Sequence, residues 1–231
     1  MTSLSHTIVR KLLIPAMALA AFSVGAQDDK PFPSKPFTII APYAVGGTAD
    51  VLARIVGDVL RKETGQTVIV DVKPGAGGTI GARQVGRAKP DGYTLLLNSS
   101  GVNSVAPAVM KDYKPEELLE HVTVLVDVPF VVVVNNQFPA KTLPEFIQYA
   151  RQNPNKVRVG NAGQGSHGHL TQVLFDKAAG VQLTSVPYKG SSLAITDLLG
   201  GHVEAVITNV AALKTFIDSH RITPLFITSK V

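Results

Sequence analysis

Short apolar runs alternate along this chain with longer runs in which apolar residues recur at the helical spacing. The apolar run at 37–41 comes before a stretch from about 49 to 62 whose apolar residues follow a period of 3.6. The alternation continues to residue 228 and predicts a mostly parallel α/β fold, with ligand groups at the carboxyl ends of the strands. Further strands are predicted at 67–72, 93–97, 157–159, 182–186, 203–207 and 225–228, and further helices at 79–88, 143–152, 169–179, 193–199 and 210–219.

The alternation is broken once, in the middle of the chain. Residues 102–120 are rich in proline and charge, and a long β-branched run follows at 122–134. We place a crossover between two domains here. The domains we expect are 27–101 and 102–222, with 223–231 as a strand returning to the first domain, which is incomplete with only three strands of its own.

The amino terminus has the three regions of a secretory leader in order. Arg10 and Lys11 precede an apolar core at 12–24 that is too short to anchor in a bilayer, and residues 24–26 fit the small-x-small cleavage rule. We therefore expect a signal peptide at 1–26 and a periplasmic protein that begins near Gln27. A buried amino-terminal helix is the alternative.

Composition excludes several kinds of site. The chain has no cysteine, so it has no disulfide, no thiolate nucleophile and no zinc-thiolate centre. The formal net charge is +5, and loss of the leader lowers it by two. Lysine and arginine are scattered with few aromatics among them, which does not support nucleic-acid binding but weakly favours small anions.

The stretch at 42–50 predicts a loop that faces an anion. Gly46 and Gly47 allow close approach of the backbone, and Thr48 is a suitable N-cap for a helix whose first N–H groups lack partners. Such a helix start favours a carboxylate or phosphate. A turn that binds nothing is the alternative. Asp50 is a candidate base, although a carboxylate in the first helical turn also has a structural use.

A second loop of this kind runs from 160 to 168. It contains G-x-G-x-x-G at 163–168, but the acid that a dinucleotide site places about 20 residues on is missing at 186–189. The same residues would instead form a second anion cradle with Ser166, and two cradles could hold both ends of a small diacid. His167 and His169 lack a carboxylate for a metal site, and the serine spacing does not fit a hydrolase.

As a set, the motifs resemble the periplasmic solute receptors of tripartite tricarboxylate transporters, often called Bug receptors. The matching stretches cover nearly the whole mature chain in the right order. They are 42–50, 74–78 with Gly81 and Ala82, 89–96, 160–170, 186–191 and 196–201.

The resemblance implies a type II-like periplasmic binding protein, with two α/β domains that close on a carboxylated solute. It implies no enzymatic activity, no cofactor and no metal, delivery of an organic acid or acidic amino acid to a membrane permease, and a monomer. Tyr43 and Tyr188 would be pocket walls, although either could simply cover the core. The ligand-binding residues it implies, together with Asp50, are Tyr43, Gly46, Gly47, Thr48, Ser99, Ser100, Gly163, Ser166, His169, Tyr188, Thr208 and Asn209.

Members of this family are longer than this chain by roughly a third, so the sequence looks truncated. We therefore expect exposed apolar surface and low stability in the first domain. Two other functions remain open at this stage. One is a secreted NADP-binding enzyme that uses residues 163–168, and the other is a non-functional receptor fragment.

Overall fold

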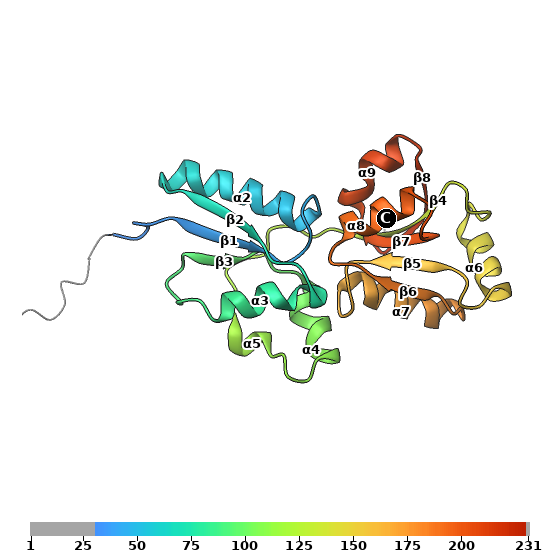
Figure 1. The fold of residues 1–231 in the computed structure, drawn as a ribbon, viewed down its shortest axis with the longest axis horizontal. Coiled ribbons are helices and arrows are strands. Elements are labelled where there is room, and N and C mark those ends of the chain that lie inside the picture. The colour runs from blue at the N-terminus through green and yellow to red at the C-terminus, as the bar shows by residue number, and fades with distance from the viewer. Residues whose placement is uncertain (1–30, 230–231) are drawn as a thin grey trace, which may run out of the picture. The chain divides into compact units, whose positions relative to one another are not determined.

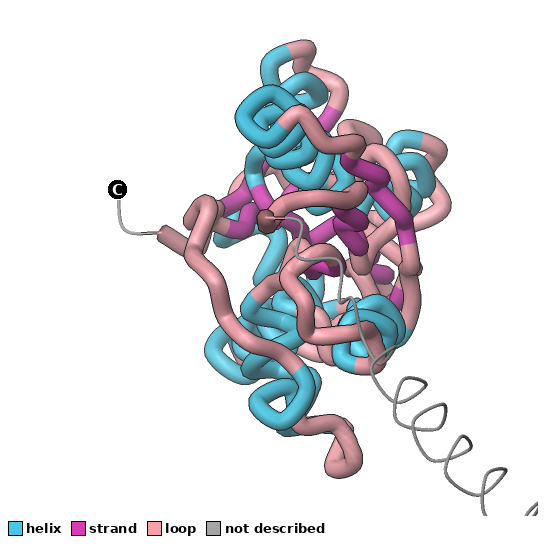
Figure 2. Tube along the Cα trace, turned by 90° about the vertical axis from the view of Figure 1, so that its left-hand side faces the viewer, coloured by secondary structure: helices cyan, strands magenta, loops and turns pink. Residues whose placement is uncertain are grey.

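The structure is a computed structural model that describes residues 31–229, so the expected leader lies outside the described residues. Residues from Lys35 onward form one compact unit that contains two sheets. We call the part built on the first sheet lobe 1 (residues 35–119) and the part built on the second sheet lobe 2 (residues 130–229). Figure 1 shows helices packed beside both sheets, and Figure 2 shows the same strands from the side.

Lobe 1 contains a parallel three-stranded sheet of order β2-β1-β3. Helix α2 packs against β1 and β2, and α3 packs against β1 and β3. The side chains of β1 alternate between these helices, with Ile39 in the cluster on α2 and Ile40 beside Gly81 of α3. The bounds are β1 Phe37–Ala41, α2 Thr48–Thr64, β2 Val68–Val72, η2 Ala76–Gly78, α3 Thr79–Gly86 and β3 Thr94–Leu96.

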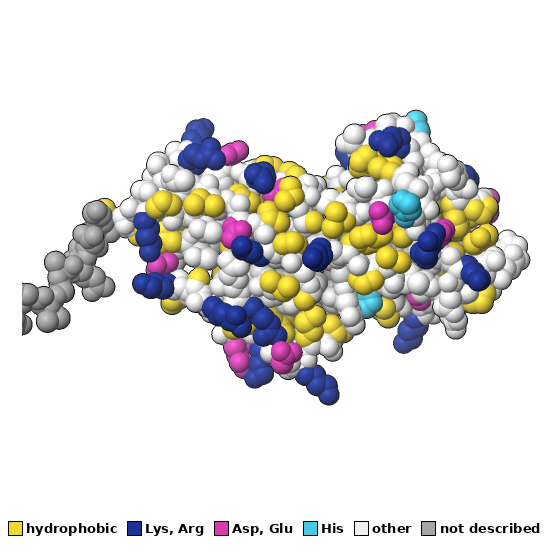
Figure 3. Space-filling view, in the orientation of Figure 1, with side chains coloured by type: hydrophobic (Ala, Val, Ile, Leu, Met, Phe, Trp, Pro, Cys, Tyr) yellow, Lys and Arg dark blue, Asp and Glu magenta, His cyan; other side chains and the backbone are white. Residues whose placement is uncertain are grey.

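Lobe 1 also exposes apolar side chains, as the sequence led us to expect. Helix α2 carries an exposed stripe at the helical spacing, formed by Val51, Ile55 and Val59. Ile69 on β2 is likewise about half exposed. Figure 3 shows hydrophobic side chains on the surface in this part of the molecule.

The chain leaves lobe 1 through short helical turns and a long extended segment. The turns are η3 Gly101–Val105, α4 Ala106–Val109 and α5 Pro115–Leu118. The β-branched run at 122–134, where we placed the domain crossover, forms a strand only from Phe130. Residues 121–127 are exposed and lie outside any sheet.

Lobe 2 contains a five-stranded sheet of order β6-β5-β7-β4-β8. The first three strands are parallel, and β4 is antiparallel to both of its neighbours. The valines of β4 are buried on both faces, with Val132 and Val134 in one core and Val131 and Val133 in the other. The bounds are β4 Phe130–Asn135, α6 Leu143–Gln152, β5 Arg158–Asn161, α7 His167–Ala179, β6 Thr184–Pro187, α8 Ser191–Leu199, β7 Ala205–Asn209, α9 Val210–Asp218 and β8 Ile222–Ile227.

The last strand differs from our expectation. We expected residues 223–231 to return to the first domain, but β8 pairs with β4 in lobe 2, with Val131 opposite Ile227. The fold class is nevertheless confirmed, because both sheets are flanked by helices in an α/β arrangement. Within residues 31–229, no helix is long and apolar enough to cross a membrane.

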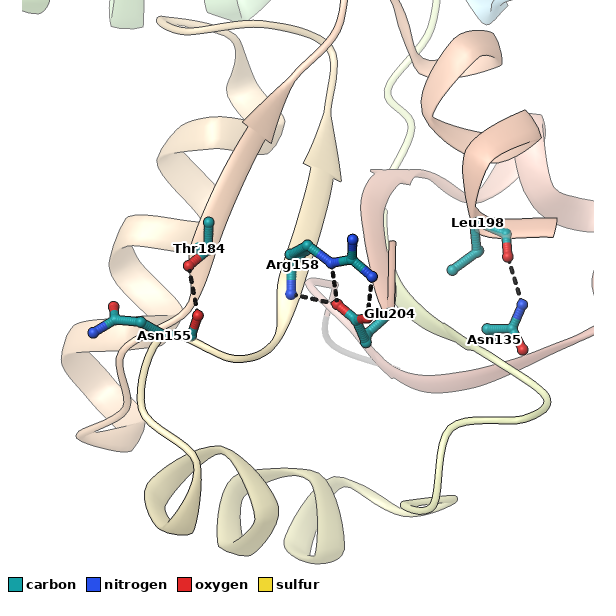
Figure 4. Close-up of polar contacts among 6 residues, drawn as sticks. All are labelled: Asn135, Asn155, Arg158, Thr184, Leu198 and Glu204. Carbon is teal, nitrogen blue, oxygen red and sulfur yellow. Dashed lines mark hydrogen bonds and ion pairs between the residues drawn. The ribbon is translucent and has the colours of Figure 1, made fainter. Parts of the chain in front are cut away.

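Polar contacts hold the amino ends of the parallel strands in lobe 2. Arg158 donates from Nη2 to Glu204 Oε1 at 2.6 Å and from Nε to Oε2 at 3.1 Å. Figure 4 shows this pair beside the Asn135 to Leu198 carbonyl bond and the Thr184 to Asn155 carbonyl bond. The loops that follow β5, β6 and β7 lie at the other end of the sheet, so these contacts fix the scaffold without occupying its ligand end.

We predict that Asp176→Asn stabilises the protein at neutral pH. Burial raises the pKa of Asp176 to about 6, although hydrogen bonds from the Leu183 amide and Gln172 act to lower this pKa. Because the folded pKa lies above the unfolded value, this group favours folding most below pH 4, and that contribution is lost as the pH rises through about 6. At pH 8 the variant should gain about 1 kcal/mol, after allowance for solvent screening.

Thermal melts from pH 4 to pH 8 check this expectation. The gain should vanish near pH 4. The matched control is Asp218→Asn, which removes an exposed ion pair with Lys214 and should change the melting temperature little at any pH. An Asp176→Asn variant that is destabilised equally at pH 4 and at pH 8 would contradict the expected gain in stability.

Candidate functional site

The predicted site residues lie in loops at the carboxyl ends of strands in both lobes. In lobe 1 these loops follow β1 and β3, and in lobe 2 they follow β5, β6 and β7. Parallel strands present their carboxyl ends at one edge, which collects the loops of each lobe there. Hydrogen bonds and close backbone contacts then join the two sets of loops.

The loop after β1 is organised by Asp50. Its Oδ2 accepts from the Gly46 amide at 2.9 Å, and its Oδ1 accepts from Arg54 Nε at 3.0 Å. Burial acts to raise the pKa of Asp50, but the Gly46 amide and Arg54 outweigh it and hold that pKa below its ordinary value. One carboxylate oxygen therefore binds the loop before α2 and the other binds a side chain of α2, and Asp50 shapes the loop.

The start of α2 differs by one residue from the prediction. Gly47, not Thr48, is the N-cap, and it offers no side chain to the first amides of the helix. Thr48 is the first helical residue, and its hydroxyl donates to Asn209 Oδ1 at 2.6 Å. The threonine thus joins lobe 1 to lobe 2 and leaves the helix end uncapped.

Tyr43 ties together the loops of lobe 1. Its hydroxyl donates to the Gly77 carbonyl at 3.0 Å and lies 2.9 Å from Ser99 Oγ. Burial raises the pKa of Tyr43, against the smaller effect of the Ser99 hydrogen bond, so the phenol keeps its proton. The side chains of Tyr43 and Ser99 therefore lie together in lobe 1.

In lobe 2 the loop after β5 is closed by its own polar groups. The Gly163 amide donates to Asn161 Oδ1 at 3.0 Å, and Asn161 is fully buried. Ser166 is the N-cap of α7 and accepts from the His169 amide at 3.3 Å. Ser166 is thereby occupied in capping, which sequence reasoning did not anticipate.

The histidine that contacts the other lobe is His167. Its Nδ1 lies 2.9 Å from Ser100 Oγ, and its ring lies 4.5 Å from that of Phe130. Burial lowers the pKa of His167, and the negative charge of Asp127 raises it by a smaller amount. The ring is therefore neutral at pH 7. His169 was predicted as a ligand contact and stays a prediction, and the histidine side chain that the structure places at the junction is that of His167.

The loop after β6 leads into a second uncapped helix. Tyr188 donates its hydroxyl to Asp197 Oδ2 at 2.6 Å, and burial followed by this carboxylate raises the pKa of Tyr188 to about 12. Two residues later Gly190 is the N-cap of α8, with no capping side chain. The preceding Lys189 carbonyl accepts from the Ala44 amide of lobe 1 at 3.1 Å.

Among residues 31–229, four direct hydrogen bonds join the loops of the two lobes. Besides Thr48 to Asn209, Ser100 to His167 and Ala44 to Lys189, Ser192 Oγ donates to the Val45 carbonyl at 2.9 Å. Thr208, by contrast, is buried in β7. The bonds bring together loops that are more than 60 residues apart in the sequence.

Glycines make this contact sterically possible. A Cβ added to Gly77 would lie 2.4 Å from the Gln164 carbonyl oxygen, and one on Gly190 would lie 2.5 Å from the Ala44 nitrogen. A Cβ on Gly101 would lie 2.8 Å from the His167 nitrogen. No side chain fits at these three positions while the lobes are in contact.

The amino ends of α2 and α8 meet at this junction. A Cβ added at Gly47 would lie 3.5 Å from Ser191 Oγ, the first residue of α8. Both helix ends lack a capping side chain, whereas α6, α7 and α9 have one in Thr142, Ser166 and Asn209. Two positive helix ends without capping side chains therefore lie close together, which favours an anion there.

Sequence reasoning missed several of these residues. Gly190 and Ser191 belonged to a motif we had noticed, and a glycine before a helical period is a signal for an uncapped start. Gly77 and Gly101 gave no such signal in the sequence, because the backbone atoms that they contact belong to Gln164 and His167 of the other lobe. In the described residues no cluster of three or more His, Asp or Glu side chains could hold a metal ion.

The dinucleotide interpretation of residues 163–168 has another explanation. A Cβ on Gly163 would lie 3.1 Å from the Tyr188 carbonyl and 3.2 Å from the Gly77 nitrogen, and one on Gly165 would lie 3.3 Å from Val109. These glycines accommodate protein atoms of the neighbouring loops. Their spacing is accounted for by packing.

Solved structures of periplasmic solute-binding proteins share this architecture. The periplasmic binding protein BugD is 36% identical with a TM-score of 0.81, over 86% of this chain and 67% of that one. Rpa4515 of R. palustris with adipate is 33% identical with a TM-score of 0.81, over 86% of this chain and 67% of that one. MatC from Rhodopseudomonas palustris with bound malate is 29% identical with a TM-score of 0.80, over 86% and 68%.

The fold is thus that of periplasmic binding proteins. Residues 52–230 match the family described as the tripartite tricarboxylate transporter family receptor, and the chain belongs to that family. The chain spans 58% to 64% of the length of the first three curated relatives that it matches, which are 35% to 38% identical to it.

We predict that Gly77→Ala separates the lobes. Its Cβ would meet the Gln164 carbonyl oxygen, whereas the control Gly65→Ala has a similar positive φ, 69° against 63°, and open space around it. Both variants should lose about 1 kcal/mol of stability from backbone strain. Only Gly77→Ala should increase the radius of gyration measured by small-angle X-ray scattering. Identical scattering from the two variants would contradict the contact.

Proposed function

We propose that this chain is a periplasmic receptor that binds a small carboxylate between its two lobes and presents it to the permease of a tripartite tricarboxylate transporter. The family supports the general role of a solute receptor. The relatives' solved structures with adipate and malate support the ligand class, because both compounds are dicarboxylates. BugD, a periplasmic binding protein, supports the periplasmic address that the leader pattern predicts.

The observation that carries the proposal is the meeting of two uncapped helix ends. Helices α2 and α8 begin at Gly47 and Gly190, and each leaves its first amides without a capping side chain. Two like-signed helix ends placed together repel each other weakly. A carboxylate between them removes that repulsion and accepts hydrogen bonds from both lobes, so it stabilises the closed form more than the open one.

Hydroxyl groups around the helix ends complete the proposed site. Thr48 and Ser192 each cross to the other lobe, and Ser100 lies against His167. When the lobes separate, these groups can turn to a solute, and a second carboxylate of that solute would meet the Ser100 and His167 side of the junction. Tyr43, Ser99, Tyr188 and Asp50 hold the loops in place around them.

Affinity in the micromolar range is consistent with this set. Charge-assisted hydrogen bonds contribute about 1.5 to 3 kcal/mol each. At about 2.5 kcal/mol each, four to six of them total about 10 to 15 kcal/mol, which exceeds the roughly 8 kcal/mol of micromolar binding and leaves a surplus to offset the ordering of the loops and the solute.

A ligand panel tests the proposed class. The purified chain is melted with acetate, succinate, malate, adipate, citrate and glutamate, with NADP as the alternative ligand. A ligand at 100 times its dissociation constant should stabilise by about 2.7 kcal/mol, which is several degrees for this size. Stabilisation by an acid supports a receptor, stabilisation by NADP alone supports a nucleotide enzyme, and a response to neither supports a non-functional receptor fragment.

The helix end of α2 is tested by a matched pair, Gly47→Asp and Gly47→Asn. Both side chains can cap α2, and Gly47 has the ordinary β-region φ of −79° that any residue adopts. Neither variant should therefore lose much stability. The aspartate places a charge where the solute carboxylate would bind, so it should weaken binding at least tenfold more than the asparagine does in isothermal titration calorimetry. Equal affinities of the two variants for the solute would contradict binding of the anion at the start of α2.

A further inference from the structure

His167 is an ionisable residue whose side chain crosses the junction of the lobes. Its Nδ1 lies 2.9 Å from Ser100 Oγ of lobe 1, and its ring lies 4.5 Å from the ring of Phe130 in β4. It is also the first residue of α7. The imidazole therefore stands where the two lobes touch and where a helix begins.

Two effects oppose a positive charge on the His167 ring in the protein alone. Burial lowers its pKa. The amino end of α7 acts in the same direction, because the helix dipole is positive there. A carboxylate beside the ring would oppose both effects, since an anion within about 4 to 6 Å favours the charged imidazolium.

Few charged groups of the protein compete with such a carboxylate. The elements in contact with α7 are η3, β5, β6 and β7, and of these only β5 contains an ionisable residue, Arg158. Arg158 is paired with Glu204 at the other end of the sheet. Asp127, which precedes β4, is the charged group that acts on the ring, and its effect is smaller than that of burial. The charge state of His167 therefore depends strongly on what binds beside it.

Ser100 can partner the His167 ring in either protonation state. A hydroxyl group both donates and accepts, so it can donate to Nδ1 when that nitrogen carries no proton and accept from Nδ1–H when it does. Protonation therefore adds a charge at the junction while the contact between His167 and Ser100 remains possible. The lobes need not separate for the ring to become charged.

We propose that His167 couples solute binding to the uptake of a proton and thereby selects solutes that carry a second carboxylate. This inference rests on the proposed function, in which that carboxylate meets the Ser100 and His167 side of the junction. The proton comes from the solvent and adds to the neutral ring as the solute binds, and it returns to the solvent when the solute leaves. A monocarboxylate held only at the ends of α2 and α8 gains no such partner.

Proton uptake is measured by isothermal titration calorimetry with malate, succinate and adipate at pH 7, repeated in buffers of different ionisation enthalpy. The wild type should take up about half a proton for each dicarboxylate bound. His167→Asn keeps a polar group within reach of Ser100 but carries no titratable charge, so its uptake should be close to zero. The matched control is His202→Asn, an exposed histidine between α8 and β7, which should take up as much as the wild type.

The pH dependence of affinity is the second readout. A site that takes up a proton on binding binds more tightly at lower pH. From pH 8 to pH 6, the affinity of the wild type for the bound dicarboxylate should rise about fivefold more than that of His167→Asn. The preference for succinate over butyrate, which lacks the second carboxylate, should be smaller in His167→Asn than in the wild type at pH 6.

The ring resonances of His167 test the same point without any substitution. Followed against pH by NMR, their midpoint should move to higher pH when a dicarboxylate is bound. An unchanged midpoint, or equal proton uptake by the wild type and His167→Asn, would overturn this inference and leave the receptor proposal standing. If none of the acids in the melting panel binds at pH 6 or at pH 8, the receptor proposal fails and this inference fails with it.

Discussion

The close approach of backbone to backbone at the junction of the lobes is the constraint on which the site depends. Gly77 and Gly190 allow carbonyl and amide groups of one lobe to reach the other at distances that a Cβ would forbid. Only then can Thr48 reach Asn209 and Ser192 reach the Val45 carbonyl. A side chain at either glycine would push the loops apart. The hydrogen bonds between the lobes would then be lost together with the close backbone contacts, because they form only while the loops touch.

This constraint also places the two uncapped helix ends together. In lobe 2 the helices α7 and α9 are capped by Ser166 and Asn209, whereas α8 begins at a glycine, as does α2 in lobe 1. A capping side chain would satisfy the amides and reduce their attraction for a ligand. The glycine caps therefore serve two purposes, because they allow close approach and keep the amide donors available. The rigid polar contacts of Arg158 with Glu204 lie at the opposite end of the sheet.

Much of this arrangement could be predicted from the sequence, because it is encoded locally. Strand and helix periods placed most elements, and glycine pairs after strands marked the loops of the site. The failures were mostly long-range. The contact of His167 with Ser100 of the other lobe had no local signal, and the pairing of β8 depends on β4. The run at 122–129 has a local strand preference, but among residues 31–229 no neighbouring strand pairs with it, and the strand begins only at Phe130.

The account is tested most directly by the backbone amide resonances of the ¹⁵N-labelled protein during titration with malate. If the carboxylate binds between the ends of α2 and α8, the largest downfield shifts should fall on the amides of residues 48–50 and 191–193, since these would donate to the anion. Amides at 163–168 should shift less, because α7 is already capped by Ser166. Shifts confined to 163–168, or spread evenly over the protein, would contradict the assignment of the two helix ends as the anion site.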